Sequence, residues 1–460
     1  MDRFFKLKEH GTNVRTEIMA GITTFMAMAY ILAVNPNILS GAPGGDWTSV
    51  FLATAIAAGV MTILMGLLVN FPVALAPGMG LNAYFATVII SSNGTFTFEM
   101  ALTAVFISGI IFILLTVTKV RQMMIVAVPD GMKHAITVGI GLFIGFLGIK
   151  NSGLMSIALE AKQDYAANGH VPLLSFETVF QLGSLSDPNV QTTIFGLVLI
   201  GVLMVIGLRG AILFGILGTT IFGFFVGIVD FSSLSSPETT WIPDFSQLRF
   251  ADFDFKGVLH AGLITVILTF TFVELFDTFG TLIGTANRAG IMKDKEKGTK
   301  KVGKAMLVDA IGVSGGALVG TSTVTAFVES SSGIAQGGRT GLTSVTTGVL
   351  FLLALFLAPI AWLIPGAATN AALIIVGVLM VQSVREIDFS NMIIAIPSFL
   401  TIVLMPLTGS IANGISFGIV TYVILATVGR LSGKSEHKVH WLMWILAVIV
   451  LARYILMGGE

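Results

Sequence analysis

Three carboxylates lie in stretches of the chain that are otherwise apolar enough to cross a membrane. Glu274 and Asp277 lie in the apolar run 259–283, and Glu329 lies in the segment 321–333, which has apolar runs on both sides. A charged side chain at the centre of a bilayer costs about 2.5–3.5 kcal/mol on insertion scales. Acids at such positions usually bind a ligand or carry protons. The sequence therefore predicts a polytopic membrane protein with a polar site near its middle.

The three acids could form one small pocket together with an amide and several aromatic rings. Glu274 and Asp277 are three residues apart, so they share one face of a helix. Asn82 follows a break rich in proline and glycine in another span. The aromatic walls would come from Phe25, Tyr84, Phe85, Phe270, Phe272, Phe276 and Phe279, of which Phe272 is the candidate for contact with the ligand.

A planar heterocycle such as a nucleobase fits this pocket. Its N–H groups can donate to carboxylates, its carbonyl can accept from the N–H groups at a helix start, and its faces can stack on rings. Buried acids would repel an inorganic anion. An amino acid would fit less well, because the pocket offers no clear cationic partner.

The same acids could carry the coupling ion. A carboxyl group that titrates near neutral pH can take up a proton on one side of the membrane and release it on the other. Two acids that lie close together resist ionising at once, which makes this easier. We therefore expect proton symport through Glu274, Asp277 or Glu329, with the proton as coupling ion and no cofactor.

Each of these residues also has a structural interpretation. Glu274 and Asp277 could be hydrogen-bonded to serine or threonine of a neighbouring span. Glu329 could cap its helix, where acids are favoured, and Asn82 could be a turn or cap residue. We interpret Asp309, in a later apolar run, as a structural acid.

The composition excludes several other classes of protein. The 460 residues are 55% hydrophobic and 11% charged, whereas a soluble domain has about 25% charged residues. The net charge is zero, which argues against a nucleic-acid partner. The chain has no cysteine, and its six histidines show no metal-binding spacing. A membrane-embedded hydrolase is disfavoured, because no GxSxG motif or Ser–His arrangement accompanies the acids, and a channel is the other alternative class.

The apolar runs predict fourteen membrane spans, since a span needs about 20 apolar residues. They are 16–35, 48–69, 71–90, 97–118, 132–149, 191–208, 211–229, 257–286, 302–320, 321–337, 341–363, 366–384, 391–407 and 410–430. A last apolar segment, 441–457, is expected to lie in the membrane interface. Lysine and arginine are concentrated in alternate connections, which predicts a cytoplasmic N-terminus in the cell membrane.

The two halves of the chain echo each other. Segments 128–135 and 364–371 each open a span of small residues, and 74–82 parallels 325–333. Seven spans separate the members of each pair, and an odd number forces opposite orientations. This pattern predicts an inverted repeat, which in secondary transporters holds the substrate near the midplane.

Spans three and ten are expected to be broken. Prolines and glycines interrupt 69–80, and glycines with β-branched residues interrupt 315–333. We interpret each as a short extended piece that leads into a half-helix. Both half-helix N-termini would then point toward the centre, where their free N–H groups suit carbonyl oxygens and anions.

Four strings of this sequence are, as a set, specific to one family. They are TEIMAGITTFMAMAYI at 16–31, APGMGLNA at 76–83, FDTFGT at 276–281 and ESSSG at 329–333. Through them the chain resembles, over nearly its whole length, the AzgA-like purine permeases. These form a branch of the nucleobase–ascorbate (xanthine/uracil permease) transporter superfamily that takes up hypoxanthine, guanine or adenine with protons.

The resemblance implies an all-α membrane protein of fourteen segments in a 7+7 inverted repeat, divided into two domains. The core would comprise residues 1–120 and 251–364, and the gate would comprise 121–250 and 365–432. Residues 433–460 would form a C-terminal interfacial helix. Alternating access would be movement of the core against the gate, and the protein would form a homodimer through its gate domains.

The resemblance also implies roles for individual residues. Glu274 and Glu329 would bind the purine directly, Asn82 with Gly80 would shape the site, and Asp277 would support the pocket or the transport step. Guanine and hypoxanthine are the expected substrates, because their N1–H can donate to a carboxylate while N1 of adenine accepts. Adenine, xanthine and uracil remain alternatives for the same fold.

Overall fold

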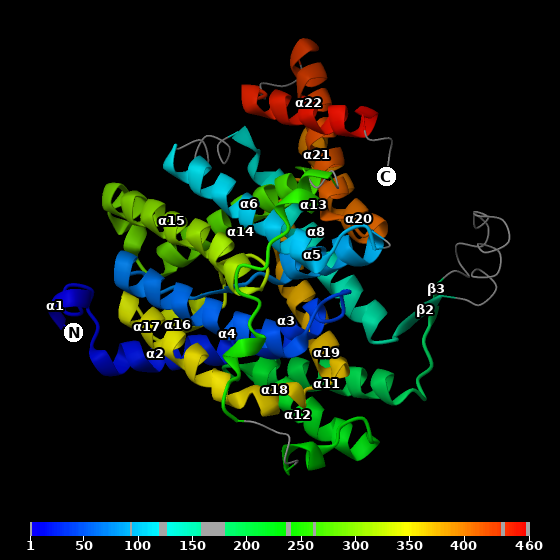
Figure 1. Ribbon diagram of the computed structural model, residues 1–460. Coiled ribbons are helices and arrows are strands. Elements are labelled where there is room, and N and C mark those ends of the chain that lie inside the picture. Colours follow the sequence, from blue (N-terminus) through cyan, green and yellow to red (C-terminus); the bar gives the residue numbers. More distant parts are fainter. Residues whose placement is uncertain are drawn as a thin grey trace.

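The computed structural model describes residues 2–92, 94–118, 127–157, 180–235, 241–260, 264–433 and 438–456. Helices make up most of these residues (Figure 1). Within them, nine helical stretches are long and apolar enough to cross a membrane. Three shorter apolar helices, the polar-faced helix α14 and a broken segment around α16 bring the number of membrane segments to fourteen, as the sequence predicts.

The segments of the two repeats follow each other in order. Those of the first repeat are α2 (Val14–Met28) with α3 (Ile31–Leu39), α4 (Trp47–Leu64) with η1 (Met65–Val69), β1 (Leu75–Pro77) with α5 (Met79–Ser91), α6 (Phe98–Val117), α8 (Asp130–Asn151), α11 (Pro188–Val205) and α12 (Ala211–Val226). Those of the second are α14 (Ile264–Arg288), α15 (Lys295–Val319), β4 (Val324–Ala326) with α16 (Ser330–Ala335), α17 (Gly341–Leu353) with η6 (Ala354–Leu357) and α18 (Ala358–Trp362), α19 (Gly366–Val381), α20 (Met392–Thr408) and α21 (Ile411–Leu431).

Smaller elements connect or precede these segments. They are α1 (Asp2–Phe5), the strands β2 (Met155–Ile157) and β3 (Phe180–Leu182), the short helices η3 (Phe231–Ser235), η4 (Phe245–Gln247), η5 (Ile291–Lys293) and η7 (Gln382–Glu386), and α13 (Phe255–His260).

Most long helices begin at a short polar side chain that accepts a hydrogen bond from a backbone N–H of the first turn. These capping residues are Asn13, Asp46, Thr97, Asp187, Asp294, Thr340, Asn391 and Ser410.

The breaks in spans three and ten are extended, as the sequence predicts, and the structure shows that they form one antiparallel strand pair. Strands β1 and β4 pair with Ala76 opposite Thr325 at the centre. The backbone bonds on either side are symmetric: the N–H of Gly78 donates to the carbonyl of Thr323 at 2.9 Å, and that of Phe327 donates to Ala74 at 3.0 Å. Each broken span therefore satisfies part of its backbone from the opposite repeat, and extended chain inside a membrane requires such partners.

Close helix packing depends on small residues facing one another, as is usual in membrane proteins. Gly141 of α8 and Gly377 of α19 each approach the other's carbonyl oxygen so closely that an added Cβ would lie 3.0 and 2.6 Å from it. Helices α8, α11, α12, α19, α20 and α21 pack on one another, and α2, α4, α6, α14, α15, α16 and α17 form a second packed group. The helices thus divide into two groups that each combine segments from both repeats.

The last helix, α22 (Trp441–Leu456), crosses α21 (Figure 1). One face, including Met443 and Ala447, is buried, while Trp441 and Trp444 are exposed. Tryptophan is enriched at membrane–water interfaces. The location of this helix in the interface stays a prediction.

Candidate functional site

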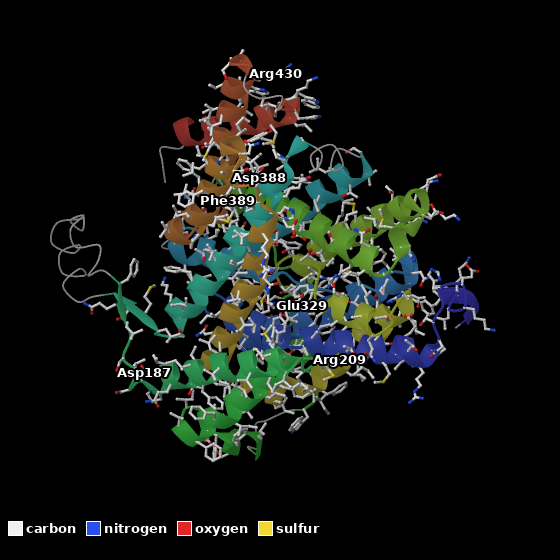
Figure 2. The ribbon with its side chains drawn as sticks, turned by 180° about the vertical axis from the view of Figure 1, so that it is seen from behind. Asp187, Arg209, Glu329, Asp388, Phe389 and Arg430 are labelled. Atoms are coloured by element: carbon white, nitrogen blue, oxygen red, sulfur yellow. The ribbon has the colours of Figure 1, made fainter. Side chains whose placement is uncertain are left out.

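The β1–β4 pair brings the starts of half-helices α5 and α16 to the middle of the molecule. Glu329 is the residue that precedes α16, and Figure 2 shows it near the centre of the side-chain view. Helix α14, which carries Glu274 and Asp277, contacts β4, α5 and α16. The three spans that hold the predicted site residues therefore meet around one strand pair.

The carboxylate of Glu329 is held by a tyrosine and does not cap its own helix. The hydroxyl of Tyr30 donates to Glu329 Oε1 at 2.8 Å, and the Glu329 side chain makes no capping bond to α16. Tyr30 is buried between α2 and α3, whereas Glu329 is half-buried and its neighbour Val328 is 59% exposed. This turn is therefore accessible on one side and anchored on the other, as a ligand-binding carboxylate requires.

Glu274 is completely buried. On its helix, Thr278 lies one turn further along the same face, and its hydroxyl is 2.9 Å from that of Thr325 in β4. Thr271, one turn earlier, donates to Ser108 of α6 at 3.2 Å. Thr271 and Thr278 thus hold this face of α14 against α6 and β4, so Glu274, which lies between them, points away from lipid.

Asn82 lies one turn into α5 and is fully buried. Its Oδ1 accepts a hydrogen bond from the hydroxyl of Ser322, which joins half-helix α5 to the segment that leads into β4. Among the residues that the structure describes, its Nδ2 group has no hydrogen-bond partner. Because Gly78 is the N-cap of α5, Asn82 is not a cap. An unsatisfied buried amide costs about 1–3 kcal/mol, which a ligand acceptor would offset.

Of the remaining residues predicted to form the site, the structure shows the contacts of Gly80 and Tyr84 but does not describe the side chains of Phe272 and Asp277. Gly80 lies against Ile140 of α8, where an added Cβ would overlap the Ile140 methyl group, so it permits close approach of α5 to α8. Tyr84 and Phe270 are in edge-to-face contact at 5.2 Å. The side chains of Phe272 and Asp277 lie outside the described residues, so the structure adds nothing to either prediction.

The structural interpretation of Asp309 agrees with its contacts. Asp309 Oδ1 accepts from the N–H of Ala326 at 2.8 Å and from the hydroxyl of Thr325 at 3.3 Å. In the other repeat, the hydroxyl of Thr62 accepts from the N–H of Leu75 at 2.8 Å. In each half, a polar residue of the preceding helix thus fixes a strand of the site.

Sequence reasoning missed Tyr30 and Glu17, both in the first span. Tyr30 was part of an apolar run, and its partner is remote in sequence, so only the fold reveals the contact. Glu17 is the second residue of the predicted span 16–35 and looks like an interfacial acid, yet it is fully buried. A signal for Glu17 did exist, because a burial-prone acid at the start of a span requires a partner.

Comparison with known proteins places this architecture in a defined class. The transmembrane domain of BicA, a cyanobacterial bicarbonate transporter, has the same fold with a TM-score of 0.61 at 18% identity, over 87% of this chain and 97% of that domain. The murine anion transporter Slc26a9 also matches with a TM-score of 0.61, at 10% identity, over 90% of this chain and 68% of its own. The chain is therefore a multi-pass membrane protein with a 7+7 transporter fold.

Sequence similarity identifies the family within this class. The Permease family (Xan_ur_permease) matches residues 15–417, so the chain belongs to this family of membrane permeases and is not an enzyme. It is 44% identical to a putative permease of Methanocaldococcus jannaschii over 100% of this chain and 99% of that one. It is 41% identical to the guanine/hypoxanthine permease PbuO of Bacillus subtilis (97% and 98% covered). It is also 41% identical to the adenine permease AdeP of Escherichia coli (95% and 92% covered).

Proposed function

We propose that this permease imports purine nucleobases by proton symport, and that guanine and hypoxanthine are its preferred substrates. The observation that carries the proposal is the half-buried carboxylate of Glu329 at the start of a half-helix, across a strand pair from the buried amide of Asn82. A purine edge offers N–H groups for such a carboxylate and a carbonyl for amide donors. Glu274, on the adjoining helix α14, supplies a second carboxylate.

The relatives support a purine but do not choose among purines. A guanine/hypoxanthine permease and an adenine permease are equally similar to this chain, at 41% identity. The choice rests on chemistry: N1–H of an oxo-purine donates to a carboxylate, whereas N1 of adenine would face it with a second acceptor. An uncompensated polar mismatch in a buried site discriminates strongly between substrates.

The two groups of packed helices support a moving-domain mechanism. We assign residues 1–120 and 251–364 to a core domain and 121–250 and 365–432 to a gate domain. Contacts of α5 and α14 with α8, and of α3 with α19, join the two groups. Substrate held at the strand pair lies on the core side of this junction, so core movement against the gate would expose it to each side in turn. Dimerisation through the gate and a cytoplasmic N-terminus remain predictions.

Uptake in a strain that lacks its own purine carriers tests the proposal. Initial rates with radiolabelled hypoxanthine, guanine and adenine should saturate and should collapse when an uncoupler removes the proton gradient. Unlabelled guanine should compete with hypoxanthine, and uracil should not. Flux that neither saturates nor responds to the uncoupler would identify a channel, and displacement by uracil but not guanine would overturn the purine assignment.

A further inference from the structure

Glu17 is a buried acid that the proposed binding site does not use directly. It lies in the first turn of α2, and its side chain is fully buried. Its carboxylate accepts backbone N–H bonds from Arg339 at 2.9 Å, Thr340 at 3.3 Å and Thr343 at 3.2 Å. The hydroxyl of Thr343 adds a fourth bond at 2.6 Å. One carboxylate from another helix thus satisfies the N-terminus of α17, where free N–H groups and the helix dipole favour a negative charge.

The first turn of α17 binds the extended segment 70–73, which leads into β1. The hydroxyl of Ser344 donates to the carbonyls of Phe71 at 2.6 Å and Val73 at 3.0 Å. The N–H of Gly341 donates to Asn70 Oδ1 at 2.6 Å. A shift of this turn would therefore move the extended piece of span three, which leads into the strand pair.

The same turn limits the position of α16. Five residues, 336–340, connect α16 to α17, and the Arg339 guanidinium donates to the carbonyl of Ile334 at 2.5 Å. With six residues, α16 is too short to be stable by itself, so its contacts must fix its position. Helix α2 provides these contacts, because an added Cβ on Gly333 would lie 2.5 Å from the carbonyl oxygen of Ala20.

Span one therefore holds the chain on both sides of α16: Tyr30 binds Glu329 just before this helix, and Glu17 binds the segment 339–343 after it. We propose that Glu17 is a positioning residue for the substrate site: it anchors α17 on α2 and so holds Glu329 in its binding position. This proposal rests on the proposed function for its effect on purine binding. Its effect on α16 is independent of any substrate.

Two variants and one control test the proposal through transport. Glu17→Gln replaces an acceptor oxygen by an amide that faces N–H donors, and Thr343→Val removes the shortest bond to Glu17 while keeping the charge. Each should raise the KM for hypoxanthine, by about tenfold for Glu17→Gln, with a smaller change in Vmax per protein copy at the membrane. Glu9→Gln is the control, since Glu9 is exposed and pairs only with the nearby Lys6 within the described part of the chain.

A labelling experiment gives a readout that needs no substrate. The chain contains no cysteine, so Ser331→Cys places a single thiol on α16. In membranes, the rate of its reaction with a permeant maleimide should change severalfold when Glu17→Gln or Thr343→Val is added, and should stay constant with Glu9→Gln. Unchanged labelling and unchanged KM in both variants, with only less protein at the membrane, would reduce Glu17 to a folding role. Altered labelling in a protein that takes up no purine would retain the positioning role and reject the proposed function.

Discussion

Loss of the Tyr30 hydroxyl should weaken substrate binding without unfolding the protein. In Tyr30→Phe the ring still fills its buried place between α2 and α3, and only the 2.8 Å bond to Glu329 disappears. A hydrogen bond to a charged group contributes about 1.5–3 kcal/mol. If all of this is lost from substrate binding, the KM rises by roughly 10- to 150-fold, since each 1.4 kcal/mol is a factor of ten.

The assay is the initial rate of hypoxanthine uptake, normalised to the amount of protein at the membrane. Tyr422→Phe is the matched control, because Tyr422 is also buried but lies on α21. Because Glu329→Gln should not transport, the pair is compared through the hypoxanthine Kd of purified protein. There the Tyr30 change should add little to Glu329→Gln, as expected for two residues that share one interaction. A KM within about twofold of the unmodified protein, at a normal amount of protein, would refute the view that Tyr30 holds Glu329 in place.

The other predictions concern the acids and the contact between α5 and α8. Glu274→Gln and Glu329→Gln should each abolish purine uptake while the protein still reaches the membrane; normal transport by both would remove them from the site. Asp277→Asn should slow transport more than it weakens binding, measured as Vmax against the Kd of purified protein, and unchanged rates would return Asp277 to a structural role. Gly80→Ala should lower Vmax because its Cβ meets the Ile140 methyl group, and Ile140→Ala should restore the rate; a Gly80→Ala protein of normal rate would show that α5 can yield there.

Much of the fold could be predicted from local sequence. Apolar length predicted all fourteen segments, most of their ends to within a few residues, because a bilayer sets the length of a span. The largest differences are at α14 and α15, which begin seven residues from the predicted 257 and 302. Proline and glycine in 69–80, and glycine with β-branched residues in 315–333, marked both breaks correctly. An extended piece in a membrane must find a partner, and the inverted repeat left each strand with the other as that partner.

The site could be predicted only in part, since its contacts join residues far apart in the chain. Glu329 and Glu274 were found because a buried acid is costly wherever it occurs. Tyr30 and the bond from Ser322 to Asn82 carry no comparable local signal, and Glu17, at the edge of a span, carries only a weaker one. Tyrosine, serine and an acid at the end of a span are ordinary residues there, and only the approach of spans one, three and ten gives them a role.

The pairing of β1 with β4 has a consequence for how the permease assembles. Neither repeat can pair its own strand, because the backbone-to-backbone hydrogen bonds of β1 and β4 join the two halves of the molecule. During synthesis, the first half would lie in the bilayer with unpaired peptide groups in β1. Their partner strand, β4, is made only after more than two hundred further residues. The centre of the protein would thus stay incomplete, and open to cellular quality control, until late in synthesis. The pairing of β1 with β4 would then complete the fold and form the proposed substrate site in one step.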